Sequence, residues 1–579
     1  MNLTWDLSNL FSDNNSFYEE FTNIKDLIIK LKECQNKPFD EASLYEALNA
    51  YWEIKKRSNN VLIYGSLKYY QDVNSKETIK LKTDAETFQN EVNLEIQFIE
   101  SQILSMGREV VLNLINKNPN LKIYHQYLDN LFRIKAHFKP QNSASIAKNN
   151  NEINEKLTSY NSIINNINYG TILIDGKEEK VTNSNINKFL ASFKREVRIN
   201  AFNLINNAYS SHADEISSIL NKIYQNRNLN IDLEEYDSVL NKVLFEENID
   251  PKIIDTLIKS VNDNLGLMQK YLKIKADQIK LDNPHLYDYG VPLVRDLDIE
   301  FSIEDAIKII KEALAPLGPD YIKAVDCLLT GHVDATPSDS KHQSIVFSWN
   351  TYSFLNYRGK YNDLKNLIHE LGHIVNYYFS QNNLPYLYED SSIFVGEVAS
   401  IVNELLLSRY LVAHAKTDQE KLFYLSKEVE NYVTSVYKQT MYTEYEKTLY
   451  DLSKKEALTP DLLSNEYEKI LHQYYGKDTT HDKESNIEWT RIGKLYLYSY
   501  YSYKYATGLI MASIVANNII NNTLSSSDYI KFLSLGSSMY SLDLLKTLNI
   551  DLLDSNIIET GFVGLETDIN EIETILKMQ

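Results

Sequence analysis

Hydrophobic residues recur every three or four positions along most of this chain of 579 residues. Ile96, Ile99 and Ile103 keep this spacing in the first third of the chain, and Ile216 and Ile219 keep it further on. A repeat of this length places apolar side chains on one face of an α-helix. Only 17 glycines and 11 prolines interrupt the pattern, and both residues destabilise helix interiors. The pattern therefore predicts a mainly α-helical protein.

Two short stretches depart from this pattern and predict β-strands. Residues 169–176 are rich in β-branched side chains and end in Asp175-Gly176, which favours a hairpin turn. Residues 345–356 alternate on either side of Asn350-Thr351, which predicts a pair of short strands. A strand of this pair could offer a free edge to an extended peptide, or the pair could be a purely structural hairpin. The sequence leaves both interpretations open.

The formal net charge of −20 bears on partners and location. Because this charge repels phosphate groups, we expect no nucleic acid and no anionic membrane surface among the partners. The first residues lack a basic region followed by an apolar core, and no stretch approaches the roughly 20 apolar residues of a membrane span. Cys34 and Cys327 are the only cysteines, which is typical of a reducing compartment, and we expect a cytoplasmic protein. Any metal site must then use histidine and carboxylate ligands.

An HExxH motif, His369-Glu370-Leu371-Gly372-His373, lies within a helical pattern. Histidines four residues apart stand one turn from each other on the same helix face, so their ring nitrogens can converge on one tetrahedral zinc ion. Glu370 lies about 100° around the helix from His369, which suits a general base that acts on water without binding the metal. A motif of this length can also arise by chance, so a third ligand is needed.

The surrounding helix is amphipathic in a way that favours a metal site. We expect it to begin near Asn362-Asp363, either of which can cap a helix. His369 and His373 lie roughly 140° to 180° from the apolar stripe on a helical wheel. They therefore face away from the packing side, as ligands in a wet cleft would. The stripe consists of Leu364, Leu367, Ile368, Leu371, Val375 and Tyr378.

A second helical pattern, residues 394–404, begins 21 positions after His373. Glu397 on this helix is a candidate third ligand, because a zinc site with two histidines commonly takes one carboxylate and keeps the fourth position for water. The alternative is an ordinary helix-face glutamate. Glu404 is either a partner that orients a ligand histidine or a surface charge. The small residues Gly396 and Ala399 should let the two helices approach closely.

Six tyrosines fall within residues 496–505, although tyrosine makes up only 42 of the 579 residues. A phenolic hydroxyl near a zinc site can donate a hydrogen bond to the oxyanion that forms when water attacks a carbonyl. For most of the six, the alternative is a packed aromatic patch whose hydroxyls are satisfied internally.

Taken together, the ordered motifs resemble oligoendopeptidase F-type members of the thimet oligopeptidase family of zinc metallopeptidases. The resemblance spans nearly the whole chain. It rests on Thr4-Trp5-Asp6-Leu7, Arg195-Glu196-Val197-Arg198, Leu317-Gly318-Pro319-Asp320-Tyr321, Asn356-Tyr357, the HExxH motif, residues 394–403 and Tyr503-Lys504-Tyr505-Ala506-Thr507-Gly508.

The resemblance implies a mainly α protein with two helical lobes around a deep substrate channel and a small β-sheet next to the zinc-binding helix. We expect residues 1–190 to form an N-terminal helical lobe and residues 191–579 the catalytic zinc metallopeptidase domain. The family pattern makes His369, His373 and Glu397 the ligands of one zinc ion per chain, and Glu370 the general base.

The tyrosine segment departs from the family in one respect. The family has a histidine where this chain has Lys494, or Leu495 if the spacing is counted back from residue 506. One contact to the oxyanion is therefore in question. Among the tyrosines we expect Tyr500 and Tyr503 to face the channel, with Tyr501 and Tyr496 behind them.

These expectations predict a zinc-dependent endopeptidase that hydrolyses internal bonds of short peptides. One alternative is a related zinc peptidase that trims chain ends, and another is a peptide-binding protein of the same fold with weak turnover. The expected partners are short peptides, and a monomer is favoured although the sequence does not fix the oligomeric state.

Overall fold

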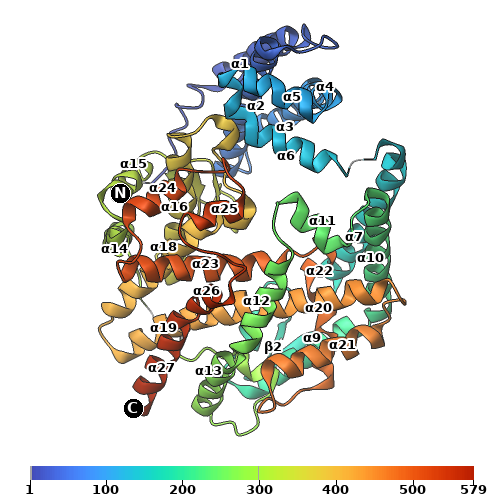
Figure 1. Ribbon diagram of the computed structural model, residues 1–579. Helices are drawn as coiled ribbons and strands as arrows, with labels where there is room; N and C mark the ends of the chain where they lie inside the picture. The colour runs from blue at the N-terminus through green and yellow to red at the C-terminus, as the bar shows by residue number, and fades with distance from the viewer. Residues whose placement is uncertain (1–2, 138, 296, 298, 579) are drawn as a thin grey trace. The chain divides into compact units, whose positions relative to one another are not determined.

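The structure is a computed structural model that describes residues 3–137, 139–295, 297 and 299–578. Helices account for most of these residues, and the strands are short (Figure 1). The prediction of a mainly α protein is confirmed. Within the described part of the chain, no helix combines the length and apolar character needed to cross a membrane.

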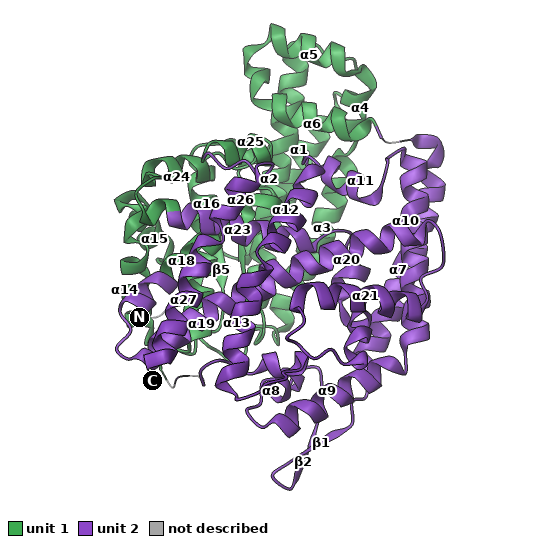
Figure 2. Ribbon diagram, turned by 60° about the horizontal axis from the view of Figure 1, so that its bottom comes forward, with its two compact units in different colours: residues 1–136, 299–407, 518–548 green, residues 137–298, 408–517, 549–579 purple. Residues whose placement is uncertain are grey.

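The chain forms two compact units, each built from three separate stretches (Figure 2). Unit 1 comprises residues 1–136, 299–407 and 518–548, and unit 2 comprises residues 137–298, 408–517 and 549–579. The predicted division into residues 1–190 and 191–579 follows the sequence, whereas these units follow contacts in space, so that division stays a prediction.

Unit 1 contains the HExxH motif. The last residues of α18 are assigned to unit 2, and the last residues of α23, a helix of unit 2, are assigned to unit 1. The helices of unit 1 are α1 (Asn14–Lys32), α2 (Glu41–Gln71), α3 (Lys76–Ile96), α4 (Phe98–Met106), α5 (Arg108–Lys117), α6 (His125–Lys135), α14 (Ile303–Ala313), α15 (Pro319–Leu328), α16 (Tyr361–Gln381), α17 (Ile393–Gly396), α18 (Val398–Ala413), α24 (Ser526–Leu533) and α25 (Ser541–Lys546), with short 3₁₀ turns at η1 (Pro119–Tyr124), η4 (Ala315–Leu317) and η5 (Tyr386–Tyr388).

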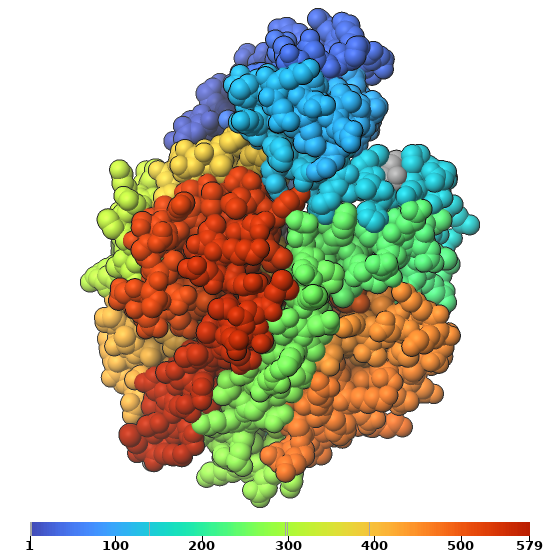
Figure 3. All heavy atoms as spheres, viewed as in Figure 1, coloured from blue at the N-terminus to red at the C-terminus, as the bar shows by residue number. Residues whose placement is uncertain are grey.

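Unit 2 brings together segments that are distant in sequence. Helices α12 and α13 contact α20, α21, α26 and α27, and Figure 3 shows these green, orange and red segments side by side. Its elements are η2 (Pro140–Asn142), α7 (Ser143–Asn166), α8 (Ile186–Leu190), α9 (Arg195–Ser210), α10 (Ala213–Glu234), α11 (Val239–Glu246), α12 (Lys252–Asp263), α13 (Leu265–Gln278), η3 (Leu286–Gly290), α19 (Asp418–Tyr432), a π-helical turn η6 (Val433–Tyr437), α20 (Lys438–Ser453), α21 (Pro460–Tyr475), η7 (Lys483–Arg491), α22 (Gly493–Leu497), α23 (Ser502–Ile520), α26 (Ser555–Thr560) and α27 (Val563–Met578).

Both predicted pairs of strands are present. In unit 2, β1 (Thr171–Ile174) and β2 (Lys177–Lys180) form an antiparallel hairpin. Asp175 and Gly176 form its turn with φ values of 51° and 78°, which suit a tight hairpin turn. In unit 1, β4 (Phe347–Trp349) and β5 (Tyr352–Phe354) are antiparallel.

A third strand that the sequence did not indicate completes the sheet of unit 1. Strand β3 (Val333–Asp334) runs parallel to β5, and the strand order β3-β5-β4 leaves β4 at an edge. Strands β4 and β5 both contact α16. Trp5 fixes the sheet in the core, because its ring lies 5.4 Å from that of Phe354 and its Nε1 donates to the carbonyl of His332 at 3.0 Å. The small sheet therefore lies beside the helix that carries the motif, as predicted.

Gly372 explains how closely α16 approaches α18. A Cβ atom at Gly372 would overlap the backbone of Ser400 and the carbonyl of Ala399. At Gly396, in contrast, an added Cβ would meet nothing within 4 Å. The expectation that Gly396 permits the close approach is wrong, since the required glycine is the one inside the HExxH motif.

Candidate metal centre and active site

Helix α16 presents the two motif histidines on its more open side. The helix begins at Tyr361, and the Asp363 carboxylate accepts the backbone N–H groups of Arg358 and Lys360 at 2.9 and 3.0 Å. The His369 and His373 side chains are 24% and 25% exposed. The orientation predicted from the helical wheel is therefore confirmed. The fully buried members of the stripe are Leu364, Leu367, Ile368, Leu371 and Val375.

His369, His373 and Glu397 bring one ligand atom each to a common point. The two Nε2 atoms lie 3.2 Å apart, and Oε2 of Glu397 lies 3.6 Å from each. A tetrahedral zinc ion with bonds of about 2.0–2.1 Å separates its ligand atoms by roughly 3.3–3.4 Å. The three side chains therefore fit one zinc ion, and within the described residues they are the one group of histidine, cysteine or carboxylate side chains that could hold a metal.

Glu397 sits at a break between two helices. The sequence indicated one continuous helix over residues 394–404, but α17 ends at Gly396 and α18 begins at Val398. The carboxylate of Glu397 is half-exposed, and it accepts the Ser400 hydroxyl at 3.2 Å. This contact holds the carboxylate close to the two histidines.

Glu404 contacts a ligand histidine rather than open solvent. Its Oε1 lies 2.5 Å from Nδ1 of His369, and its Oε2 lies 2.9 Å from Nζ of Lys365. Burial alone would raise the pKa of Glu404, but the hydrogen bond with His369 and the charge of Lys365 lower it. A proton held on Nδ1 leaves the Nε2 lone pair of His369 for a metal. Of the two roles considered for Glu404, the contacts favour orienting His369.

The two histidines differ in their affinity for protons. Burial is the largest single influence and lowers the pKa of His369. The hydrogen bond to Glu404 and the charges of Glu404, Glu370 and Glu397 together outweigh burial and raise the pKa to about 8. Burial, followed by the neighbouring His369, lowers the pKa of His373. His373 is therefore the more readily neutral of the two rings, and a neutral ring is the form that binds metal.

Strand β4 positions Glu370. The hydroxyl of Ser348 on β4 donates to Oε2 of Glu370, and the Glu370 side chain is only 6% exposed. Sequence reasoning missed Ser348. The signal was present, because period-two alternation places Ser348 on the opposite face of the strand from Phe347 and Trp349.

A cavity of about 460 Å³ contains this group of side chains. It is bounded by β4, α16 and the segment that leads into α17, and Glu389 and Asp390 lie in that segment. Burial raises the pKa of both carboxyls, and for Glu389 the hydrogen bond from Tyr377 and the charge of Lys56 offset part of this effect. The lining contains four carboxylates and, among the described residues, no lysine or arginine.

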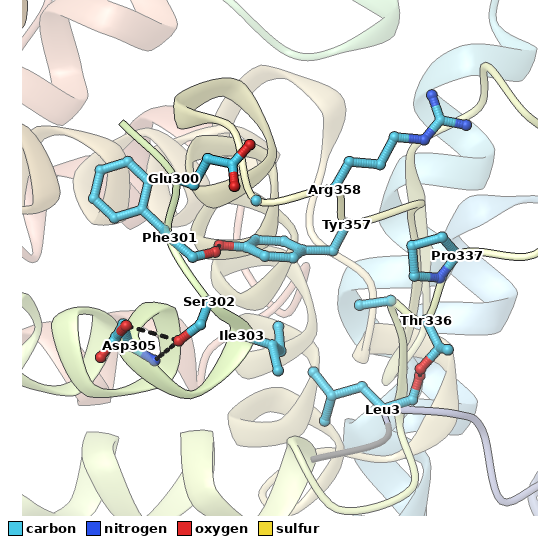
Figure 4. A pocket seen from close by; sticks show the side chains of 12 residues that line it. Leu3, Glu300, Phe301, Ser302, Ile303, Asp305, Thr336, Pro337, Tyr357 and Arg358 are labelled. Carbon is cyan, nitrogen blue, oxygen red and sulfur yellow. Dashed lines mark hydrogen bonds between the residues drawn. The ribbon is translucent and has the colours of Figure 1, made fainter. Parts of the chain in front are cut away.

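A separate hollow of about 550 Å³ in unit 1 contains none of the predicted site residues (Figure 4). Its polar groups make local contacts. The Ser302 hydroxyl donates to Asp305 at 2.7 Å as part of the cap of α14, and the Tyr357 hydroxyl donates to the carbonyl of Phe301 at 2.9 Å. These contacts secure the start of α14 and the loop before α16.

Comparison with known proteins decides the family. The model for peptidase family M3 matches residues 189–563. Oligopeptidase PepF of Bacillus subtilis is 30% identical over 99% of this chain and 87% of its own length. An oligoendopeptidase F homolog of Borreliella burgdorferi is 28% identical over 99% of this chain and 98% of its own.

The chain belongs to peptidase family M3. The resemblance to oligoendopeptidase F inferred from the motifs is thereby confirmed, and so is the prediction of a metallopeptidase.

Solved structures agree with the M3 peptidase fold. A crystal structure from Chlamydophila abortus superposes with a TM-score of 0.92 at 25% identity and covers 99% of this chain and 98% of that one. Oligoendopeptidase-F from Enterococcus faecium gives a TM-score of 0.73 at 22% identity, with 98% of this chain and all of that chain (100%) covered.

The tyrosine run of this M3 peptidase lies in unit 2. Tyr500 and Tyr503 are 2% and 0% exposed, whereas Tyr498 and Tyr505 are 56% and 41% exposed. The Tyr503 hydroxyl lies 3.4 Å from Oε2 of Glu247. The assignment of Tyr500 and Tyr503 as oxyanion donors stays a prediction, and Tyr498 and Tyr505 are the members of the run with the most accessible rings.

Lys494 on α22 is held by side chains of α20 and α23. Its Nζ donates to Oε1 of Gln439 at 2.9 Å and lies 3.6 Å from the centre of the Tyr505 ring. Burial lowers the pKa of Lys494 to about 8. The amine at this position is therefore a weaker base than an ordinary lysine, which brings its proton affinity closer to that of the histidine that the family pattern would place here.

A buried carboxyl group fixes the backbone in the middle of the run. Tyr500 has a φ of 49°, a conformation that bulky residues rarely adopt. Its N–H donates at 2.9 Å to Oε1 of Glu446, which is 1% exposed. Burial raises the pKa of Glu446 to about 8, although the N–H of Tyr500 and the charge of Arg227 oppose the shift.

This shift predicts a loss of stability at alkaline pH that a Glu446→Gln variant should lack. Between the ordinary glutamate pKa of 4.5 and about 8, the folded chain binds more protons at this site than the unfolded chain. The stabilisation from proton binding at Glu446 is therefore complete below pH 4.5 and is lost as the pH rises to 8, a change of about 5 kcal/mol. We expect Tm of the variant to exceed that of the parent by several degrees at pH 9 but not at pH 5, measured by thermal unfolding. Glu456→Gln, at an exposed position, should show no such difference, and parallel Tm curves for Glu446→Gln and the parent would contradict the prediction.

Proposed function

We propose that this M3 peptidase is a zinc-dependent endopeptidase that hydrolyses internal bonds of short oligopeptides. The observation that carries the proposal is the triangle of ligand atoms with edges of 3.2, 3.6 and 3.6 Å. His369, His373 and Glu397 would hold one zinc ion per chain. Zinc bound there supplies a Lewis acid that polarises the scissile carbonyl and lowers the pKa of a water molecule.

Glu370 acts as the general base. Its carboxylate accepts a proton from the attacking water and then passes the proton to the departing amine. Ser348 fixes one oxygen of this carboxylate and keeps it directed into the cavity. Glu404 holds His369 in the orientation and tautomer that leave Nε2 free. Tyr500 and Tyr503 stay the proposed donors to the oxyanion.

The edge of β4 supports binding of an extended peptide. Ser348 on this strand contacts Glu370, and β4 has a partner strand on one side only. A peptide added alongside β4 would gain main-chain hydrogen bonds that are independent of its sequence. This mode suits an enzyme that accepts many short peptides, and the channel implied by the family resemblance stays a prediction.

The carboxylates of the cavity favour cationic side chains near the cleaved bond. Tyr377, which donates to Glu389 at 2.6 Å, follows His373 by four residues on α16. Four residues of helix span about 6 Å, and an extended peptide covers this length in about two residues. Glu389 and Asp390 therefore lie within reach of side chains next to the scissile bond.

An Asp390→Asn variant should weaken a preference for basic peptides. For two peptides that differ only in lysine or glutamate beside the cleavage site, we expect the parent to show the higher kcat/KM with lysine. Loss of one charge should reduce the ratio of kcat/KM for the lysine peptide to kcat/KM for the glutamate peptide about five-fold, on the order of 1 kcal/mol. Asp339→Asn, an exposed position outside the cavity, serves as the control. An unchanged ratio in Asp390→Asn would reject this role.

Product masses from one peptide test the proposed function. An octapeptide should be cut at internal bonds by the zinc-loaded protein, and blocking both of its ends should leave the rate within about a factor of three. Loss of cleavage on blocking would instead identify an enzyme that trims chain ends. Tight peptide binding without any product would identify a peptide-binding protein of the same fold.

A further inference from the structure

Unit 2 contains a cavity of about 520 Å³ that the proposed reaction does not use. It is lined by α13, η3, the π-helical turn η6 and η7, and all its lining residues belong to unit 2. We call it the unit 2 cavity. Its volume falls in the range of sites for small molecules. Five aromatic side chains line it, namely Phe202, Tyr271, Tyr287, Tyr289 and Tyr475.

The charge of the unit 2 cavity is opposite to that of the whole chain. The chain carries −20, yet four cations and only two carboxylates line the cavity. The lining therefore carries an excess of two positive charges, which favours an anionic ligand. The cations are Lys275, Lys427, Lys438 and Arg491, and the carboxylates are Glu430 and Glu488.

Lys275 and Lys438 are hydrogen-bonded within the cavity and the Nζ of Lys427 lies over the Phe423 ring, whereas Arg491 is not hydrogen-bonded to any described residue. Lys275 donates to the carbonyl of Tyr289 at 2.8 Å and to Glu430 at 3.2 Å. Glu488 accepts from Lys438 at 2.9 Å and from the Tyr467 hydroxyl at 3.0 Å. Arg491 lies 3.9 Å from Glu488, which is beyond hydrogen-bond distance.

The Arg491 guanidinium is therefore available to a ligand. Within the described part of the chain, no hydrogen bond from this guanidinium is seen, and its side chain is 28% exposed. A guanidinium group binds a carboxylate through two parallel hydrogen bonds.

Ser485 provides a second, independent indication of a ligand. It lines the unit 2 cavity, is 4% exposed, and its Oγ has no hydrogen-bond partner among the described residues. A buried hydroxyl without a hydrogen-bond partner destabilises the protein, and a ligand that accepts its proton in a hydrogen bond would remove this penalty. Ser485 precedes Arg491 by six residues on the same segment η7. Val433 and Thr434 of the π-helical turn line the cavity as well, and such turns are frequent at functional sites.

We propose that the unit 2 cavity binds an α-carboxylate that is attached to an aromatic or large apolar side chain. Arg491 and Ser485 hold the carboxylate, and the tyrosine rings surround the apolar group. Both a free amino acid and the C-terminal residue of a peptide carry this chemistry, and every cleavage of a peptide creates a new C-terminal carboxylate. The proposal rests on the unit 2 cavity and is independent of the zinc site.

Calorimetric titration of the zinc-loaded full-length protein tests the proposal. We expect N-acetyl-L-phenylalanine to bind at least ten-fold more tightly than N-acetyl-L-phenylalanine amide, which lacks the carboxylate. Equal affinities for acid and amide, or no binding of the acid at millimolar concentration, would overturn the proposal. Titration with free phenylalanine distinguishes a site for free amino acids from a site for peptide C-termini, because only a site for free amino acids accommodates the charged amine.

Two variants and one matched control locate the binding. Arg491→Gln and Ser485→Ala should each weaken binding of the acid about ten-fold, and Ser485→Ala removes an unpaired hydroxyl, so its fold should be kept. Lys483→Gln, an exposed residue of η7 outside the cavity, should leave the affinity unchanged. Because a zinc ion can also bind carboxylates, the titration is repeated after removal of metal with a chelator. Loss of binding on removal of the metal, or equal affinity for the acid in the parent and in both cavity variants, would place the ligand elsewhere and reject the site.

Discussion

Replacing Glu370 by glutamine should lower kcat by about three orders of magnitude while zinc stays bound. Glutamine keeps the size of the side chain and can still accept the Ser348 hydroxyl, but its amide cannot take a proton from water. General base catalysis accelerates a reaction by a factor of about 10²–10⁴. Because Glu370 is not one of the three converging ligands, the metal content should not change. Hydrolysis of an internally quenched peptide and metal analysis of the same sample measure both quantities.

A glutamate far from the cavity serves as the control. Glu91 lies on an exposed face of α3 in the same unit, and Glu91→Gln should hydrolyse the peptide at the parental rate. Full activity of Glu370→Gln would reject the general base. Loss of zinc from this variant would show instead that Glu370 helps to hold the metal.

Local periodicity was sufficient to predict the orientation of the HExxH helix. The apolar stripe of α16 is fully buried at Leu367 and Leu371, and His369 and His373 lie on the more open side. The strands β4 and β5 were predictable for the same reason, since alternation over a few residues depends only on which face is buried.

Contacts between elements could not be predicted in the same way. Sequence left the role of Glu404 open, because its contact with His369 depends on the rotation of α18 against α16. The need for glycine at position 372 likewise depends on how closely these two helices approach each other. Alternation places Ser348 on the opposite face of β4 from Phe347 and Trp349, but a three-residue strand does not show that this face meets Glu370.

The tyrosine segment shows a further limit of periodicity. A single helical repeat cannot be applied to residues 496–505, because α22 ends at Leu497, Tyr500 has a positive φ, and α23 begins at Ser502. The break changes which side chains are buried. It also depends on Glu446, which is 54 residues away in sequence. A long-range hydrogen bond of this kind leaves no local signal.

Replacing His373 by alanine should remove both zinc and activity while the fold is kept. Two of the three converging ligands would remain, and two ligands hold zinc poorly at neutral pH. We expect zinc content to fall from one ion per chain to below about one tenth, and kcat/KM to fall by more than about 10³. His373 points away from the buried stripe, so Tm of the variant should match that of the chelator-treated parent.

Three measurements decide this prediction. A chelator should abolish hydrolysis by the parent and added zinc should restore it, whereas His373→Ala should stay inactive at the same zinc concentration. His125→Ala, at an exposed position of α6 in the same unit, should keep both metal and rate. If His373→Ala retained stoichiometric zinc, the ligand set would have to include another side chain. Because the described residues offer no second group of histidine, cysteine and carboxylate side chains that could hold a metal, that result would contradict the assignment of the metal centre as a whole.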